Sequence, residues 1–233
     1  MTPETSLHAA AVSVALLHTL VGVDHYLPFV VIGRARRWSR TKLASVTALC
    51  GLGHVIGSIA LGLVGIGLGT AVGSLEWVES LRGELAAWSL IAFGLAYAAW
   101  GLNRLRRDHA HTHAHTHADG TVHTHHHDHH SAHAHAHAAA GPALGSLFLI
   151  FVLGPCEPLI PVLMAPAFQQ DLVLVLQVAG LFAVTTIATM VGAALVASAG
   201  LQLAPLGRLE RYSHVGAGAV IASSGLAIQI LGI

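Results

Sequence analysis

Two polar motifs lie at matching places inside two long apolar stretches of this chain. The first, GVDHYLP, begins at Gly22, and the second, GPCEPLIP, begins at Gly154. Ionisable groups inside an apolar membrane segment lose hydration worth several kcal/mol, so by default they are functional. The matching positions predict one polar site between two repeats. Aligning the motifs places Asp24 on Cys156 and His25 on Glu157.

The composition indicates a membrane environment. Hydrophobic side chains make up 54% of the 233 residues and charged side chains only 9%, whereas soluble domains carry about 25% charged residues. We therefore expect an integral membrane protein built from α-helices, which bond all their backbone polar groups internally. The net charge is zero and the basic residues form short clusters beside apolar segments, so a nucleic-acid partner is not expected. We expect a protein that is not an enzyme and that holds no tightly bound cofactor, and we find no nucleotide-binding motif that would supply energy for transport.

Six apolar segments are long enough to cross a bilayer, which takes about 20 helical residues. They lie at residues 6–33, 43–73, 85–103, 142–168, 171–200 and 212–233. Gly22 and Pro28 bracket the motif of the first segment, and three prolines within seven residues interrupt the fourth. Because proline removes a helical hydrogen bond and clashes with the preceding turn, both segments are predicted to be broken helices.

The two halves also match outside the polar motifs. In the first half, the tripeptide GLA begins at Gly94 and is followed by Gly101. In the second half, GLA begins at Gly225 and is followed by Gly232 at the same spacing. Three segments per half is an odd number, so the second repeat must be inverted in the membrane relative to the first. The sequence thus predicts an all-α fold of six transmembrane helices in a 3+3 inverted repeat. The first repeat covers residues 1–107, a loop covers 108–140 and the second repeat covers 141–233.

Basic residues predict the orientation of the chain. Ten of the eleven lie in the first, third and fifth loops, namely Arg34, Arg36, Arg37, Arg40 and Lys42, then Arg104, Arg106 and Arg107, then Arg208 and Arg211. Positively charged loops stay in the cytoplasm, so both termini are predicted to face outward. We expect a multi-pass protein of the cell inner membrane, with lipid as a partner and a homo-oligomer as a compatible state.

A histidine-rich tract occupies the predicted third loop. Between His109 and His137, 14 of 29 residues are histidine. The tract lacks bulky apolar residues, so we expect a disordered cytoplasmic loop. Imidazole suits zinc, copper, nickel and cobalt, and with an unperturbed pKa of about 6.5 many rings are neutral at cytoplasmic pH. The tract indicates a loop that concentrates, senses or buffers a transition metal; an expansion without a role is the alternative.

The candidate metal ligands are ionisable side chains within the apolar segments. They are His18, Asp24, His25, His54, Cys156 and Glu157. In a straight helix, His18 and His25 would lie about 10.5 Å apart along the axis, too far for one ion, and a break at Gly22 would shorten that distance. Together these side chains offer the mixed nitrogen, oxygen and sulfur shell that nickel, cobalt and zinc accept.

Each candidate also has a second interpretation. His18 and His54 are compatible with hydrogen bonds between helices. Asp24 and His25 are compatible with pairing with each other or with Glu157. A cysteine often packs as a small apolar group, and a buried Glu157 is suited to carrying protons. Some further residues are expected to matter less: Cys50 for packing, His8 and His214 at the membrane interfaces, and Thr185 and Thr186 at the repeat position of His54.

The stretch HTLVGVDH, from His18 to His25, resembles the first-half signature of the nickel/cobalt transporter families, a His followed by an Asp-His pair. It is most similar to the branch grouped with urease-accessory and nickel/cobalt efflux membrane proteins, whose members often carry a His-rich cytoplasmic loop. The resemblance implies that His18, Asp24 and His25 help to form a metal path. The spacing between the His and the Asp-His pair is one residue longer than is usual in the family.

The second motif is also similar to the Pro-Cys motifs of membrane thiol-electron carriers of the cytochrome-biogenesis type. Those carriers need a reactive cysteine in each half, and here Asp24 stands at the first-half position. We expect a secondary transporter of divalent transition-metal ions, with nickel or cobalt as the substrate, zinc as a further candidate and export as the favoured direction. The alternatives are a membrane accessory protein that buffers metal for a metalloenzyme, and a thiol-electron carrier.

Overall fold

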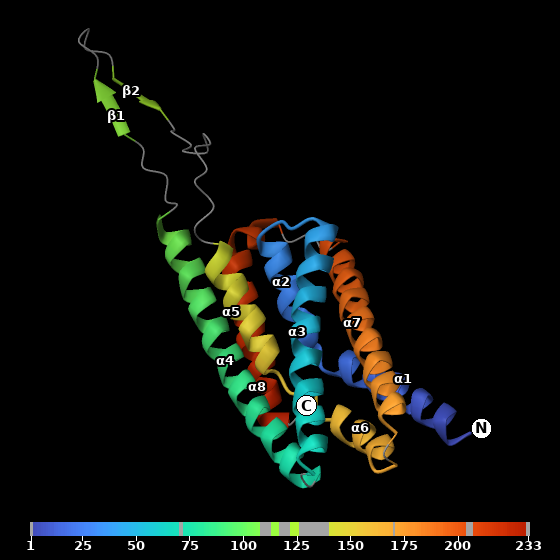
Figure 1. Cartoon of the computed structure of the whole chain (residues 1–233). Coiled ribbons are helices and arrows are strands. Elements are labelled where there is room, and N and C mark those ends of the chain that lie inside the picture. Colours follow the sequence, from blue (N-terminus) through green and yellow to red (C-terminus); the bar gives the residue numbers. More distant parts are fainter. Residues whose placement is uncertain are drawn as a thin grey trace.

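The computed structural model describes residues 2–69, 72–107, 113–116, 122–125, 140–169, 171–203 and 207–231. These residues are mostly helical, with one short two-stranded hairpin (Figure 1). The elements are α1 (Pro3–Val21), the 3-10 turn η1 (Val23–His25), α2 (Leu27–Ala35), α3 (Arg40–Gly67), α4 (Val72–Arg107), β1 (His113–Thr116), β2 (Val122–His125), α5 (Ala140–Leu153), α6 (Leu159–Ala167), α7 (Leu172–Leu203), the 3-10 turn η2 (Gly207–Tyr212) and α8 (Ser213–Leu231).

Within the described ranges, five helices are long and apolar enough to cross a membrane. They are Pro3–Val21, Arg40–Gly67, Gly73–Arg106, Leu172–Gln202 and Glu210–Leu231. The sequence predicted six, but the break in the fourth segment leaves α5 as a shorter apolar helix. Large apolar side chains such as Ile56, Trp88 and Val184 are exposed on the outer faces of α3, α4 and α7. An apolar exterior of this kind is compatible with a multi-pass membrane protein.

Both predicted helix breaks are present. The first separates α1 from α2 and contains η1, and the second separates α5 from α6. Gly22 is required at the first break, because a Cβ there would lie 2.5 Å from Nδ1 of His25. At the second break, Pro155 and Pro158 have no amide hydrogen with which to continue the α5 ladder.

The element boundaries recur at an offset of 132 residues. This offset relates Val21 to Leu153 at the ends of α1 and α5, Leu27–Ala35 to Leu159–Ala167 in α2 and α6, and Arg40 to Leu172 at the starts of α3 and α7. Even the N-caps correspond, since Ser39 caps α3 and Asp171 caps α7. Helix contacts follow the same rule, because α1 packs on α7 as α5 packs on α3.

The helices α4 and α8 form the most extensive helix pair of the fold. Glycines at matched positions bring the two backbones together. A Cβ at Gly94 would lie 2.4 Å from the amide nitrogen of Ala222, and one at Gly225 would lie 2.8 Å from the carbonyl oxygen of Ala87. The absence of side chains at these points allows the close approach that stabilises helix pairs in lipid.

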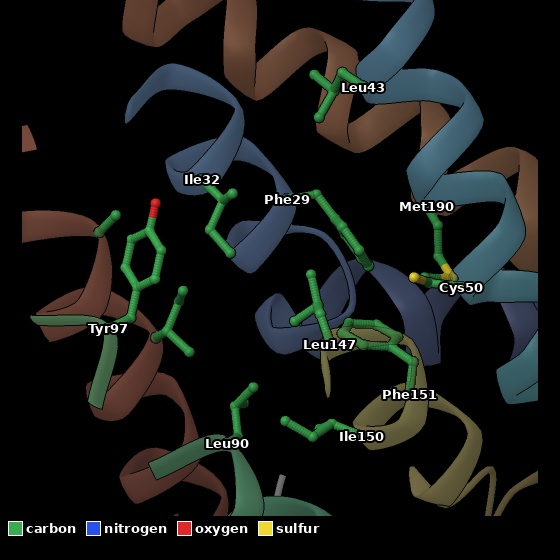
Figure 2. Packing of buried hydrophobic residues seen from close by; sticks show 12 residues of the cluster. Phe29, Ile32, Leu43, Cys50, Leu90, Tyr97, Leu147, Ile150, Phe151 and Met190 are labelled. Atoms are coloured by element: carbon green, nitrogen blue, oxygen red, sulfur yellow. The ribbon is translucent and has the colours of Figure 1, made fainter. Parts of the chain in front are cut away.

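A buried apolar cluster joins the two halves (Figure 2). Phe29 on α2 faces Phe151 on α5 with ring centroids 4.6 Å apart, and Cys50 on α3 and Met190 on α7 belong to the same cluster. The prediction that Cys50 serves packing is confirmed by its place in this cluster. Cys156 belongs to a second cluster, formed mainly with α1, α6 and α7, and neither cysteine is in a disulfide.

The basic segments gather at one end of the bundle, at the top of Figure 1, where α2 connects to α3, α4 ends, α5 begins and α7 connects to α8. Arg37 pairs with Glu210 across two of these connections at 3.6 Å. Between α4 and α5, β1 and β2 pair antiparallel, with His113 opposite His125. The sequence predicted a disordered loop over residues 108–140; apart from β1 and β2, this loop lies outside the described residues up to residue 139.

Candidate metal centre

The first break brings three histidines together. It turns His25 back onto His18, so that their ring centroids lie 4.7 Å apart instead of the roughly 10.5 Å that a straight helix would impose between these positions. His54, near the middle of α3, lies beside His25 with a ring separation of 5.0 Å. The predicted shortening of the distance from His18 to His25 is therefore confirmed.

A thiol from the second break joins this group. His18, His54 and Cys156 each offer one ligand atom, and the three atoms lie within 4.8 Å of one another. Ligand atoms around one tetrahedral ion are roughly 3.5 Å apart, given metal–ligand bonds of about 2.0–2.3 Å. A contraction of about 1 Å, within the reach of side-chain rotation, would place all three atoms on one ion.

The three imidazoles carry buried nitrogens without a partner. Nε2 of His18, His25 and His54 is buried, and none of the three has a hydrogen-bond partner in the described part of the chain. An unpaired buried polar atom costs about 1–3 kcal/mol. Three such nitrogens in neighbouring rings indicate a binding site for a ligand that accepts nitrogen lone pairs.

Hydrogen-bond acceptors on the opposite side of the His25 ring orient its Nε2. Nδ1 of His25 lies 2.9 Å from the carbonyl oxygen of Gly22 and 3.3 Å from Oδ1 of Asp24. Both neighbours are acceptors, so Nδ1 carries the proton and Nε2 keeps its lone pair. Carbonyl and carboxylate partners of this kind fix the tautomer of metal-binding histidines.

A cavity of about 180 Å³ opens beside the histidines. Its polar wall is formed by His18, Asp24, His25 and His54, and α4, α5 and α8 complete it with mostly apolar residues. One water takes up about 30 Å³ in the liquid, so an ion fits with part of its hydration shell. Gly154 keeps this space open, because a Cβ there would lie 3.0 Å from Nδ1 of His54.

Glu157 does not belong to the group of His18, His54 and Cys156. Glu157 directly follows the fully buried Cys156, yet Glu157 is exposed. Thr186 is buried on α7, and its hydroxyl is unpaired among the described residues, whereas Thr185 donates to the carbonyl oxygen of Leu181. His214 bonds with the hydroxyl of Tyr97 at 3.0 Å, near the start of α8.

Two charged residues beside the site were not predicted from the sequence. The third segment was expected to begin at residue 85, but α4 begins at Val72 and includes Glu79 and Arg82. Glu79 is fully buried and accepts a hydrogen bond from the amide of Cys156. The sequence offered one signal for them: an acidic and a basic residue lie three positions apart at the edge of an apolar stretch, which is the spacing of an ion pair on a helix.

Comparison with known proteins gives no family assignment. No protein-family model matches the chain, and no curated protein or solved structure matches it. The functional argument therefore depends on the geometry of the histidines, the thiol and their surroundings.

Proposed function

We propose that this chain is a membrane transporter of divalent transition-metal ions that binds its substrate at His18, His25, His54 and Cys156. The observation that carries the proposal is the group of three unpaired, buried imidazole nitrogens beside a buried thiol. Ionisable side chains inside apolar membrane helices mark ion pathways by default. Broken helices are tolerated at membrane depth where they line a cavity, and both breaks adjoin this one.

The types of ligand favour one class of ion. Imidazole and thiolate suit zinc, nickel, cobalt and copper, whereas magnesium, calcium and manganese favour oxygen shells. Among the described residues, Asp24 is the one carboxylate in the cavity wall, so hard cations find few of the ligands they prefer. The resemblance of the stretch from His18 to His25 to nickel/cobalt transporters favours nickel or cobalt within this class, with zinc next.

The charges of the site suit a divalent ion. A Cys156 thiolate and the Asp24 carboxylate supply two negative charges, and the neutral histidines supply none. A bound divalent ion would leave the site neutral, which matters because an uncompensated charge in the bilayer costs at least several kcal/mol. Binding releases the thiol proton, since the thiolate is the metal ligand.

The architecture supports a 3+3 inverted repeat around this site. Element boundaries recur 132 residues apart, and α4 meets α8 through glycines at matched positions. The first half supplies the histidines and the second half supplies the thiol. Inverted repeats that hold their substrate between discontinuous helices are a common plan of secondary transporters.

The basic end of the bundle is assigned to the cytoplasm, because positively charged loops stay on that side. The His-rich segment between α4 and α5 then also lies in the cytoplasm, where it would raise the local metal concentration. A loading loop at the cytoplasmic mouth favours export.

Metal flux into proteoliposomes loaded with a metal-sensing dye tests the transport proposal. We expect saturable flux for one or two of nickel, cobalt and zinc, and none for magnesium, calcium or manganese, because of the ligand types. Protein-free liposomes and the His25→Ala variant serve as controls without transport. Tight metal binding without flux of any of these ions would reject the transporter and favour the accessory protein.

Deleting residues 109–137 separates transport from buffering. The four proposed ligands lie in α1, η1, α3 and the second break, outside this tract. The deletion is therefore expected to leave flux at saturating metal largely unchanged, while the number of ions bound in equilibrium dialysis falls. Loss of flux together with nearly all bound metal would support the buffering function instead.

A further inference from the structure

A buried polar cluster from α3 and α4 surrounds the second break. Glu79 on α4 is fully buried, and its Oε2 accepts hydrogen bonds from the amide of Cys156 at 2.9 Å and from the hydroxyl of Ser58 at 3.3 Å. Its Oε1 pairs with Arg82, three residues further along α4. The carboxylate therefore connects α3, α4 and the backbone of the break.

Arg82 holds the other side of the break. Its Nη2 donates to the carbonyl oxygens of Val152 at 2.9 Å and Gly154 at 3.3 Å. These carbonyls lie at the C-terminal end of α5, where the helix leaves its acceptors without partners. The positive charge there also complements the negative end of the α5 dipole.

Two glycines make room for this arrangement. A Cβ at Gly57 would lie 2.8 Å from Nη2 of Arg82 and 2.9 Å from the carbonyl oxygen of Val152. A Cβ at Gly83 would lie 3.0 Å from Cγ of Pro155. The helices α3 and α4 therefore pack closely against the second break, and little space remains for its backbone to shift.

We propose that Glu79 and Arg82 are positioning residues for the metal centre, which hold the second break so that the thiol of Cys156 faces the histidines. The inference rests on the proposed function. Cys156 and Glu157 are neighbours in the break, one fully buried and the other exposed. The bond from Glu79 to the Cys156 amide fixes the peptide orientation that selects between them.

The first break is held independently of Glu79 and Arg82. Its ligand His25 is bonded within its own turn, through both the backbone nitrogen and Nδ1 to the carbonyl oxygen of Gly22. Disturbing Glu79 should therefore affect the thiol and spare the histidines. This separation makes the role measurable.

Cobalt(II) titration of the purified full-length chain reports the thiol directly. A thiolate bound to cobalt gives a charge-transfer absorption in the near ultraviolet that histidine ligands do not give. Glu79→Gln keeps the size and removes the charge, and we expect it to lose most of this absorption and to bind cobalt about 10–100-fold more weakly. The matched control, Glu84→Gln, changes an exposed residue of the same helix and should retain both properties.

A double-mutant cycle distinguishes positioning from general damage. If Glu79 acts through the thiol, adding Glu79→Gln to Cys156→Ser costs little further affinity, because the two changes remove the same contact. Additive losses, or a Glu79→Gln protein with normal affinity and absorption, would overturn the inference.

Arg82→Lys keeps the charge but not the paired donors to α5. This variant should also lose the absorption. It replaces Glu79→Gln if that variant does not fold. A wild-type chain that shows the absorption but no flux would reject transport and leave the positioning role intact.

Discussion

His54→Ala is expected to abolish saturable metal flux and to weaken cobalt or zinc binding by at least about 100-fold. The ring of His54 lies 5.0 Å from His25, and its ligand atom lies within 4.8 Å of those of His18 and Cys156. Removing it takes away the ligand that α3 contributes to this group and leaves an ion with one imidazole fewer. Isothermal titration in detergent measures the affinity, and the proteoliposome assay measures the flux.

Two further variants sharpen this prediction. His54→Gln retains a polar side chain but no imidazole, so it should lose affinity as His54→Ala does. His8→Ala removes a histidine from α1 that lies outside the group, and it should keep the wild-type affinity. Wild-type affinity in both His54 variants would reject the metal centre.

The histidines of the site were predictable because local rules bring them together. Glycine and proline affect the backbone conformation of the few residues around them, so Gly22 and Pro28 predicted a helix break between His18 and His25. His54 was predicted from its apolar surroundings, where an ionisable group is unusual. The structure brings these three rings together around one cavity.

The rest of the site depends on tertiary contacts that no short stretch of sequence encodes. Glu79 and Arg82 lowered the local hydropathy, so residues 74–84 were predicted to form an outer loop, although they belong to α4. Their charges are compensated by each other and by the second break, which a hydropathy count does not register. For the same reason the sequence did not distinguish Cys156 from Glu157 as the inward-facing neighbour.

The two thiols also bear on the electron-carrier alternative. Cys50 and Cys156 belong to separate apolar clusters. A dithiol relay needs two cysteines that reach one another. The pairing of Cys156 with two histidines instead favours metal binding.

The contact between α4 and α8 sets the spacing of one wall of the site. A Cβ at Gly218 would lie 2.4 Å from the amide nitrogen of Ala98 and 2.5 Å from the carbonyl oxygen of Gly94. Both are backbone atoms, so a side chain fits only if the two helices separate. Ala87 on α4 and Ile228 on α8 line the cavity beside the histidines, and such a separation would reach the metal centre.

Gly218→Ala is therefore expected to destabilise the fold by about 3 kcal/mol through overpacking, a fall in Tm of roughly 6–12 °C for a chain of this size. Thermal unfolding of the detergent-solubilised protein measures this change. Gly216→Ala, on the same helix with nothing within 4 Å of its Cβ position, should keep or raise the Tm, because alanine favours a helix by about 1 kcal/mol. Equal Tm values for the two variants would mean that the backbones of α4 and α8 are not in close contact. A Gly218→Ala protein that remains folded should also bind metal more weakly than Gly216→Ala, because the same helix pair forms a wall of the cavity.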